Sequence, residues 1–293
     1  MFKKLGTDRL LNFTDERTSS NLMKQSVLDA ENIHLKVLEF ILNCVEIPTE
    51  ELALKLLHVA YKFMVSLIWN FQNIKPSLIP YIPSISHHLK KNVGCIDFLK
   101  EMYDNNKTML FNEANLLRFV KEICSTIENE PDSSFYKSKL LDFFRFLIYC
   151  NGKSLKFNQI QILKVMQDDS YKKIILQISK EDIEKLVAKY TEDYEELEFK
   201  RTSNIVKIEP RLLYMITYFQ ILESLIDDKN SVNMGKLKKR FPFETLVDWV
   251  RASRNCWPLK RNIRAFLNRL YYFEPEVEIY MKKIIGCELD NII

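Results

Sequence analysis

The sequence predicts an all-α protein, and more specifically an armadillo- or HEAT-like right-handed α-solenoid. Glycine is scarce, at 5 of 293 residues, whereas tight β-turns and phosphate-binding loops need glycine for positive φ angles. Apolar residues recur at helical spacing in most segments between turn signals. Pairs of these segments recur at roughly 40 residues, which is the length of armadillo and HEAT units.

Residues 140–167 form the clearest predicted helix pair. The first part, 140–150, is apolar on almost every side, which is typical of a buried helix. Asp142 and Arg145 interrupt it three residues apart, and therefore on one face. An Asn-Gly-Lys turn follows, in which Gly152 suits the left-handed position after a helix. The second helix has apolar residues at helical spacing: Phe157, Ile160, Leu163 and Met166.

Turn signals divide the rest of the N-terminal half. Thr49 and Asn112 are expected helix N-caps. Three prolines at 76, 80 and 83 indicate a loop or short turns. The helices predicted here span residues 22–44, 50–70, 93–103 and 113–128.

The C-terminal half begins with residues 171–178, which fit either a strand or a helix. Ser179 and Asp182 predict a capping box that opens a helix to about residue 190. Residues 191–208 are expected to form an exposed acidic loop. Later helices should begin near prolines, because the missing proline N–H would be unpaired in a first turn anyway: Pro210, Pro242, Pro258 and Pro275.

We therefore expect one domain with a single continuous core. A polar lead-in covers residues 1–22, the solenoid covers 23–285, and a tail covers 286–293. The expected sub-blocks of the solenoid are residues 23–130, 135–190 and 209–285, with the acidic loop 191–208 between the last two.

Composition excludes several classes of protein. A hydrophobic content of 47% with 28% charged residues is that of a folded, soluble chain. No apolar run approaches the ~18 residues of a membrane span, and the N-terminal residues lack the apolar segment of a signal peptide. The 6 cysteines form no C-x-x-C pair, so we interpret them as reduced, buried, cytosolic-type thiols.

No motif in the sequence indicates catalysis, a cofactor or a metal. The glycine-containing motifs for nucleotides and activated serines are absent. The histidines lack metal-ligand spacing, and we interpret them as exposed or capping side chains: His34, His58, His87 and His88. We expect a protein that is not an enzyme and that holds no cofactor or metal.

One charge pattern stands out between residues 229 and 269, where eleven cations face two acidic side chains, a local net charge of +9. It indicates a site for a phosphoinositide, nucleic acid or an acidic protein surface, or else a solvated helix face. The cations are not interleaved with exposed aromatics, so we favour protein contact or solvent over nucleic acid; Phe241, Phe243 and Trp249 suit the core. The candidate contact residues are Lys236, Lys238, Lys239, Arg240, Arg251, Arg254, Lys260, Arg261 and Arg264.

Several segments resemble the RIH domain, which inositol trisphosphate receptors and ryanodine receptors share. CNGKSLKFNQ, at residues 150–159, is similar to an element of that domain in which a small residue, a glycine, an apolar residue and an Asn-Gln pair follow one another. The stretch FLN…YYFEPEVE, at 266–278, is similar to a run in inositol trisphosphate receptors. Further matching segments follow in the order and spacing of that family over about residues 35–283: 98–111, 212–232, 241–250 and 256–282.

The resemblance implies the middle armadillo-like solenoid of a tetrameric calcium-release channel, on the cytosolic face of the endoplasmic reticulum. Its partners would be other domains or subunits of the channel, and its role would be to relay the ligand-binding state to the pore. The β-trefoil and pore of that family have no match here, so no ligand or ion site is carried over. The alternative is a stand-alone armadillo-type adaptor that binds a protein partner or an anionic surface through its basic C-terminal face.

Overall fold

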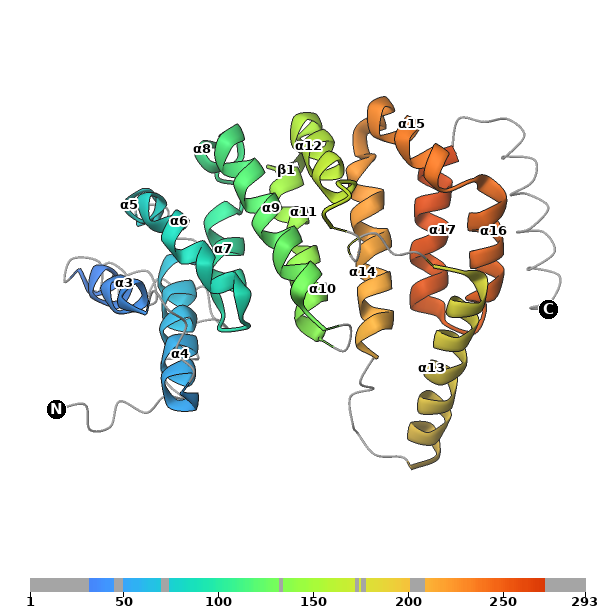
Figure 1. The fold of residues 1–293 in the computed structure, drawn as a ribbon, viewed down its shortest axis with the longest axis horizontal. Coiled ribbons are helices and arrows are strands. Elements are labelled where there is room, and N and C mark those ends of the chain that lie inside the picture. Colours follow the sequence, from blue (N-terminus) through green and yellow to red (C-terminus); the bar gives the residue numbers. More distant parts are fainter. Residues whose placement is uncertain are drawn as a thin grey trace. The chain divides into compact units, whose positions relative to one another are not determined.

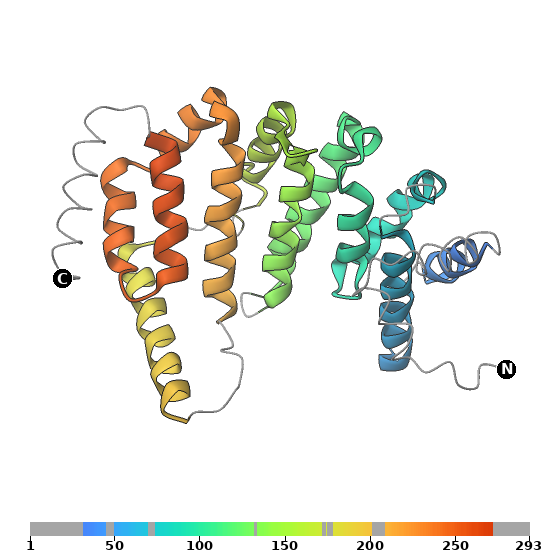
Figure 2. The same cartoon turned by 180° about the vertical axis from the view of Figure 1, so that it is seen from behind.

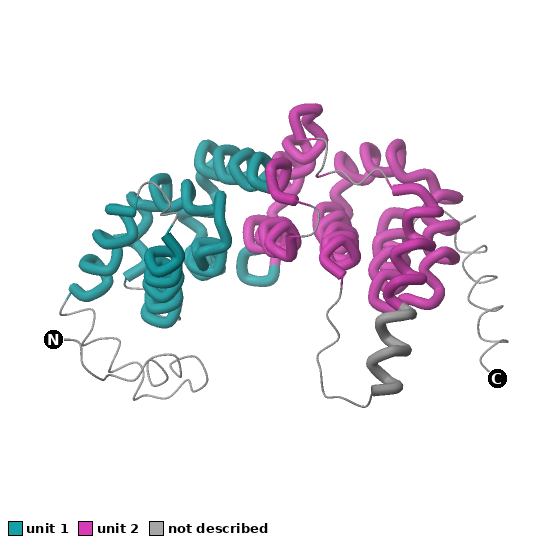
Figure 3. Tube along the Cα trace, turned by 60° about the horizontal axis from the view of Figure 1, so that its bottom comes forward, with its two compact units in different colours: residues 1–126, 149–152 teal, residues 127–148, 153–293 magenta. Residues whose placement is uncertain are grey.

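The computed structural model of the protein describes residues 32–44, 50–69, 74–131, 134–171, 174, 178–200 and 209–271, without the side chains of 191–200. These residues are mostly helical (Figure 1), which confirms the all-α class. The chain divides into two compact units, where we expected one core. Residues 1–126 and 149–152 form the N-terminal unit, and residues 127–148 and 153–293 form the C-terminal unit (Figure 3).

In the N-terminal unit, the helix α4 packs against α3 and α7. The three prolines of residues 74–90 lie in the first turns of α5, η2 and α6, so the expected loop is a series of short helical turns. The elements are α3 (Ile33–Asn43), α4 (Glu51–Ile68), α5 (Lys75–Leu78), η2 (Ile79–Tyr81), α6 (Ile82–Ile85), η3 (Ser86–Lys90), α7 (Cys95–Tyr103), α8 (Lys107–Leu110) and α9 (Glu113–Asn129), whose last residues belong to the other unit.

A buried histidine links three elements of this unit. His88 Nε2 lies 2.8 Å from the carbonyl oxygen of Cys44, and its Nδ1 lies 2.6 Å from the hydroxyl of Tyr61. Since a carbonyl only accepts, Nε2 carries the proton and Tyr61 donates to Nδ1. The prediction of exposed or capping histidines is therefore wrong for His88, and also for His34, which is 4% exposed. Burial is tolerated at His88 because both ring nitrogens have partners.

In the C-terminal unit, α14 stands between α10 and α17, as Figures 1 and 2 both show. Helix α16 packs on α17, and α13 packs on α16. The elements of this part of the chain are α10 (Phe135–Asp142), α11 (Phe144–Ile148), β1 (Tyr149–Cys150), β2 (Lys153–Ser154), α12 (Lys156–Met166), α13 (Lys180–Lys200), α14 (Pro210–Leu225), η4 (Asp227–Lys229), α15 (Ser231–Arg240), α16 (Phe243–Ala252) and α17 (Trp257–Tyr271). By its contacts, β1 with the turn 151–152 belongs to the N-terminal unit.

The predicted central pair is more broken than the apolar pattern indicated. Phe143 separates α10 from α11, although its N–H still donates to the carbonyls of Lys139 and Leu140, at 3.2 and 3.3 Å. Residues 149–150 are extended rather than helical. Gly152 has the expected positive φ, 72°. Phe157 is 46% exposed, so it does not continue the buried face of α12.

The acidic loop predicted at 191–208 is wrong for residues 191–200, which continue α13 to Lys200. This stretch has no glycine or proline and is rich in glutamate, which favours a helix. The capping box is confirmed: the N–H of Asp182 donates to Ser179 Oγ, and the N–H of Ser179 donates to the Asp182 carboxylate, both at 3.1 Å.

Other predicted boundaries agree with the structure. Asn112 caps α9, since its Oδ1 accepts from the N–H of Asn115 at 3.0 Å. Three of the four proline-marked helices begin as predicted, at α14, α16 and α17. Outside the described residues lie Thr49, Pro275, the lead-in 1–22, the tail 286–293 and the helix residues 22–31.

Aromatic rings form the core of the C-terminal unit. The ring of Phe219 lies 6.0 Å from those of Trp249 and Phe266, measured between centroids, and Phe241 lies 5.6 Å from Phe266. The Phe219–Trp249 and Phe241–Phe266 pairs are edge-to-face, an arrangement that at such distances stabilises beyond the area that the rings bury. Phe241 and Trp249 are buried as predicted, whereas Phe243 is half-buried. This cluster fixes α14, α16 and α17, and thereby the turn between the last two.

Candidate functional site

The nine predicted contact cations lie in two groups. Four are on α15, at 236, 238, 239 and 240, and Lys238 lies over the ring of Tyr271 at 5.2 Å, at the C-terminal end of α17. The others lie on α16, in the turn 253–255 and on the first half of α17. Since a 15-residue helix is about 22 Å long, the α15 cations and those before α17 do not form one small site.

The α15 group is partly used by the fold itself. Lys238 covers Tyr271, and the Arg240 guanidinium lies 5.9 Å from the centre of the Phe241 ring. Burial raises the pKa of the Tyr218 hydroxyl, and the nearby Arg240, which hydrogen-bonds to it, acts in the opposite direction. Lys238 and Arg240 therefore shield aromatic rings from water in addition to carrying charge.

Two arginines of the second group lie within about one helical turn, along the chain, of an exposed tryptophan. Trp257, the first residue of α17, is 65% exposed. Arg261 lies one turn later on the same helix face, and Arg254 lies in the turn just before the helix. We call Arg251, Arg254, Trp257 and Arg261 the basic corner. Neither Arg254 nor Arg261 forms an ion pair with the carboxylates of the described residues.

Buried neighbours hold the basic corner in place. The Ser253 hydroxyl donates to the carbonyl of Val250 at 3.0 Å, and the N–H of Cys256 donates to the carbonyl of Ser253 at 2.9 Å. Cys256 and Leu259 are fully buried. Trp257 lies between these two residues in the sequence. Because both of their side chains are buried in the core, the side chain of Trp257 is left toward solvent.

A cleft of about 400 Å³ adjoins the basic corner, between α13 and the end of α16. Its charged lining is mainly cationic, since Lys180, Arg251 and Arg254 face the single carboxylate of Glu184. Lys180 lies 3.9 Å from Glu184 and Arg251 lies 3.4 Å from Asp248, and such exposed pairs are weak. The cleft is therefore suited to a carboxylate or another small anionic group.

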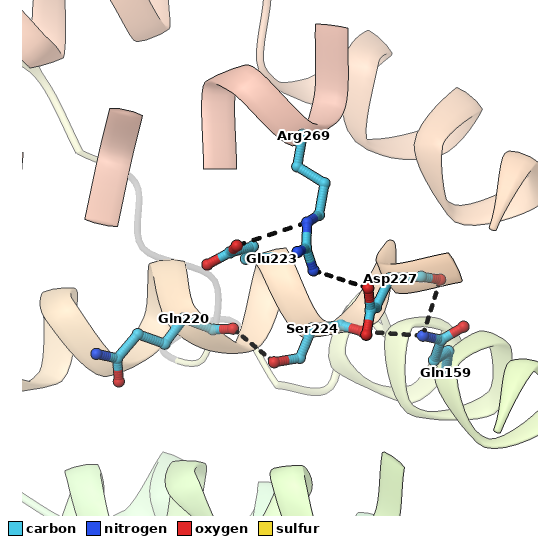
Figure 4. A network of polar contacts seen from close by, with 6 residues as sticks. All are labelled: Gln159, Gln220, Glu223, Ser224, Asp227 and Arg269. Atoms are coloured by element: carbon cyan, nitrogen blue, oxygen red, sulfur yellow. Dashed lines mark hydrogen bonds and ion pairs between the residues drawn. The ribbon is translucent and has the colours of Figure 1, made fainter. Parts of the chain in front are cut away.

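A second cleft, of about 480 Å³, lies where α14 ends, and its charges are largely neutralised. Figure 4 shows Arg269 between two carboxylates, 3.5 Å from Glu223 and 2.9 Å from Asp227. The buried amide of Gln159 donates to the carbonyls of Ser224 at 2.9 Å and Asp227 at 3.3 Å. This network holds the turn after α14, and we interpret it as structural.

Two observations on the described residues bear on metal binding and thiol chemistry. No group of three or more His, Cys, Asp or Glu side chains that could hold a metal ion is found among them. Burial raises the pKa of the thiols of Cys95 and Cys256, which makes both poor nucleophiles at neutral pH. In the same part of the chain, no helix has the length and apolar character needed to cross a membrane.

Searches of protein-family models and of curated proteins found no match to this chain. Sequence reasoning did select the arginines of the basic corner, but it missed Trp257. The stretch Trp-Pro-Leu-Lys-Arg could have indicated it, because a tryptophan at the first position of a helix with proline second lies at an element end, where burial is least complete.

Proposed function

We propose that this protein is a non-catalytic helical scaffold whose basic corner binds an acidic segment of a partner protein. The observation that carries this proposal is the exposed Trp257 with Arg254 and Arg261 beside it and a cationic cleft adjoining them. Tryptophan and arginine are the residue types most enriched among those that dominate binding energy at protein interfaces. A side-chain carboxylate of the partner would enter the cleft, while an apolar group would pack on the indole.

A protein partner is favoured over nucleic acid by the arrangement of the aromatics. Single-stranded nucleic acid is bound by successive aromatic platforms along a basic groove. Here one exposed indole lies beside the cations, whereas Phe241 and Trp249 are buried and Phe243 is half-buried. The side-by-side packing of α10, α14, α17 and α16 supports the further proposal that the C-terminal unit is an armadillo- or HEAT-like stack.

The test is binding of a fluorescent glutamate-rich peptide that contains leucine, measured by anisotropy. We expect Trp257→Ala and the pair Arg254→Glu with Arg261→Glu each to weaken binding by about tenfold or more. The matched control reverses two exposed lysines of the same unit, Lys153→Glu with Lys164→Glu, and should change little. Tighter binding of a single-stranded RNA or of anionic vesicles, lost in the same variants, would replace the protein partner with that ligand.

A second candidate is a regulatory solenoid of an inositol trisphosphate receptor-like calcium-release channel. The segment 150–159, which carries part of the resemblance, ends at the Asn158-Gln159 pair. Both side chains are buried and hydrogen-bonded, Asn158 to the carbonyl of Leu147 at 2.7 Å. The buried hydrogen bonds give the Asn-Gln pair a structural role. Because this pair is part of the element on which the resemblance rests, the contacts favour this candidate. In a channel, such packed helices would relay rotations between ligand-binding and pore domains at the cytosolic face of the endoplasmic reticulum.

The coding sequence on either side of this chain separates the two candidates. A reading frame that continues into a β-trefoil upstream and pore helices downstream would establish the channel. A reading frame closed by stop codons at both ends would leave the adaptor, and the peptide assay would then decide its partner.

A further inference from the structure

Helix α4 of the N-terminal unit carries an exposed apolar stripe. Leu52, Leu56 and Val59 are 70%, 51% and 55% exposed, and the half-buried Phe63 follows at the next helical position. Single exposed apolar side chains are common in soluble proteins. A row of them on one helix face forms a larger apolar patch, which is typical of an interaction site.

The spacing of the stripe indicates the shape of what covers it. The steps from residue 52 to 56, 59 and 63 are four, three and four residues, which is the seam spacing of helices that pair lengthwise. The seam is about 16 Å long at 1.5 Å per residue. A straight, narrow apolar seam of this kind fits the apolar face of a second helix.

The charges beside the seam indicate the chemistry of that helix. Lys55 and Lys62 are both exposed and lie seven residues apart along the same border. Lys55 already has Glu51 at 2.6 Å, but both side chains are more than two-thirds exposed, at 70% and 83%, and such a pair is weak. Carboxylates on the flank of an incoming helix would therefore find two cations at matching positions.

A second copy of this chain fits the same border poorly. Antiparallel pairing of two α4 helices about the middle of the seam would bring Lys55 of each copy next to Lys62 of the other, which is repulsive. Parallel pairing would place the lysines beside the alanines of the other border, Ala53 and Ala60. On this border of α4, Glu51 is the one carboxylate beside the two lysines and already pairs with Lys55, so the borders of two copies would face each other with a net positive charge.

We propose that the seam of α4 docks an amphipathic α-helix of another protein, one whose apolar face is bordered by carboxylates. This site lies in the N-terminal unit and is independent of the basic corner. Its ligand differs too, since the seam requires a helix, whereas the basic corner requires only an acidic segment.

The probes are two fluorescent helical peptides of the length of α4, with the same leucine seam and either glutamate or lysine at the flanking positions. We expect saturable binding of the glutamate-flanked peptide to the full chain. Leu56→Asp and Val59→Asp should each weaken it by about tenfold or more. Phe111→Asp, an equally exposed apolar residue of the same unit at 68%, is the matched control and should bind as the wild type. Unchanged circular dichroism and melting of all variants shows that they fold.

Charge reversal separates docking from general stickiness. Lys62→Glu should weaken binding of the glutamate-flanked peptide and strengthen binding of the lysine-flanked one. Equal effects on both peptides, or the absence of saturable binding, would overturn the proposal. Light scattering supplies the remaining outcome, because a wild-type dimer that Leu56→Asp converts to a monomer would show that a second copy occupies the seam.

Discussion

We expect His88 to make the N-terminal unit sensitive to acid, because its ring is buried and both of its nitrogens have hydrogen-bond partners. Desolvation lowers the pKa of His88, the hydrogen bond to the Cys44 carbonyl opposes this, and the neighbouring His87 adds to it. Protonation would also force Nδ1 to donate where Tyr61 already donates. Below the ordinary histidine pKa of about 6.5 the unfolded chain takes up a proton that the folded chain resists.

We therefore expect the stability of the N-terminal unit to fall as the pH drops below about 6.5, and to be constant above it as far as this residue is concerned. The measurement is the urea midpoint reported by Trp69 fluorescence across this range. His88→Gln should flatten the pH dependence, while His87→Gln, at a ring that is 62% exposed, should keep it. An unaltered slope in His88→Gln would mean that other groups cause the acid sensitivity.

At the scale of elements, the central pair α11–α12 offers a direct comparison of two phenylalanines. Phe144 is fully buried and Phe157 is 46% exposed. Phe144→Ala removes a buried ring and leaves a cavity, so we expect a loss of about 3–5 kcal/mol in the free energy of unfolding. Phe157→Ala should cost less than about 1 kcal/mol. Urea unfolding of both variants checks this, and similar losses would contradict the assignment of Phe144 to the core.

Local signals were enough to predict several helix ends. The capping box at Ser179, the cap at Asn112 and the helix starts at Pro210 and Pro258 each depend on residues within one turn. The misses have non-local causes. His88 is buried because of Tyr61, 27 residues away, and no spacing rule contains that contact. Phe157 fits the helical period of α12, but its exposure depends on which neighbouring helices cover that face.

The sequence was enough to predict the arginines of the candidate site, but not how they are arranged in space. Cationic residues between 229 and 269 are visible in the sequence, yet their division between α15 and the basic corner follows from the direction of α17. Lys180 contributes to the cleft from α13, some seventy positions before Arg251. The exposure of Trp257 results from the burial of Cys256 and Leu259 beside it. Such relations arise only when helices distant in sequence pack together.

At the scale of the whole molecule, the two compact units imply separate cores. Tyr61, Phe98 and Phe119 are buried in the N-terminal unit, whereas Phe219 and Phe266 are buried in the C-terminal unit. If each core supports its own cooperative transition, a defect in one unit should leave the stability of the other unchanged. A suitable defect is available at Gly94, which has φ 90°.

Gly94→Ala should destabilise the N-terminal unit alone. An added Cβ would lie 3.1 Å from the Cβ of Tyr61 and 3.3 Å from Nδ1 of His58, in a backbone conformation that alanine rarely adopts, so we expect a loss of about 1–3 kcal/mol. Single-tryptophan variants read each unit separately, with Trp69 in the N-terminal unit and the buried Trp249 in the C-terminal unit. The urea midpoint reported by Trp69 should fall while that reported by Trp249 stays. Equal falls of both midpoints would mean that the two units unfold as one cooperative body, since strain at Gly94 reaches the second core only through such coupling.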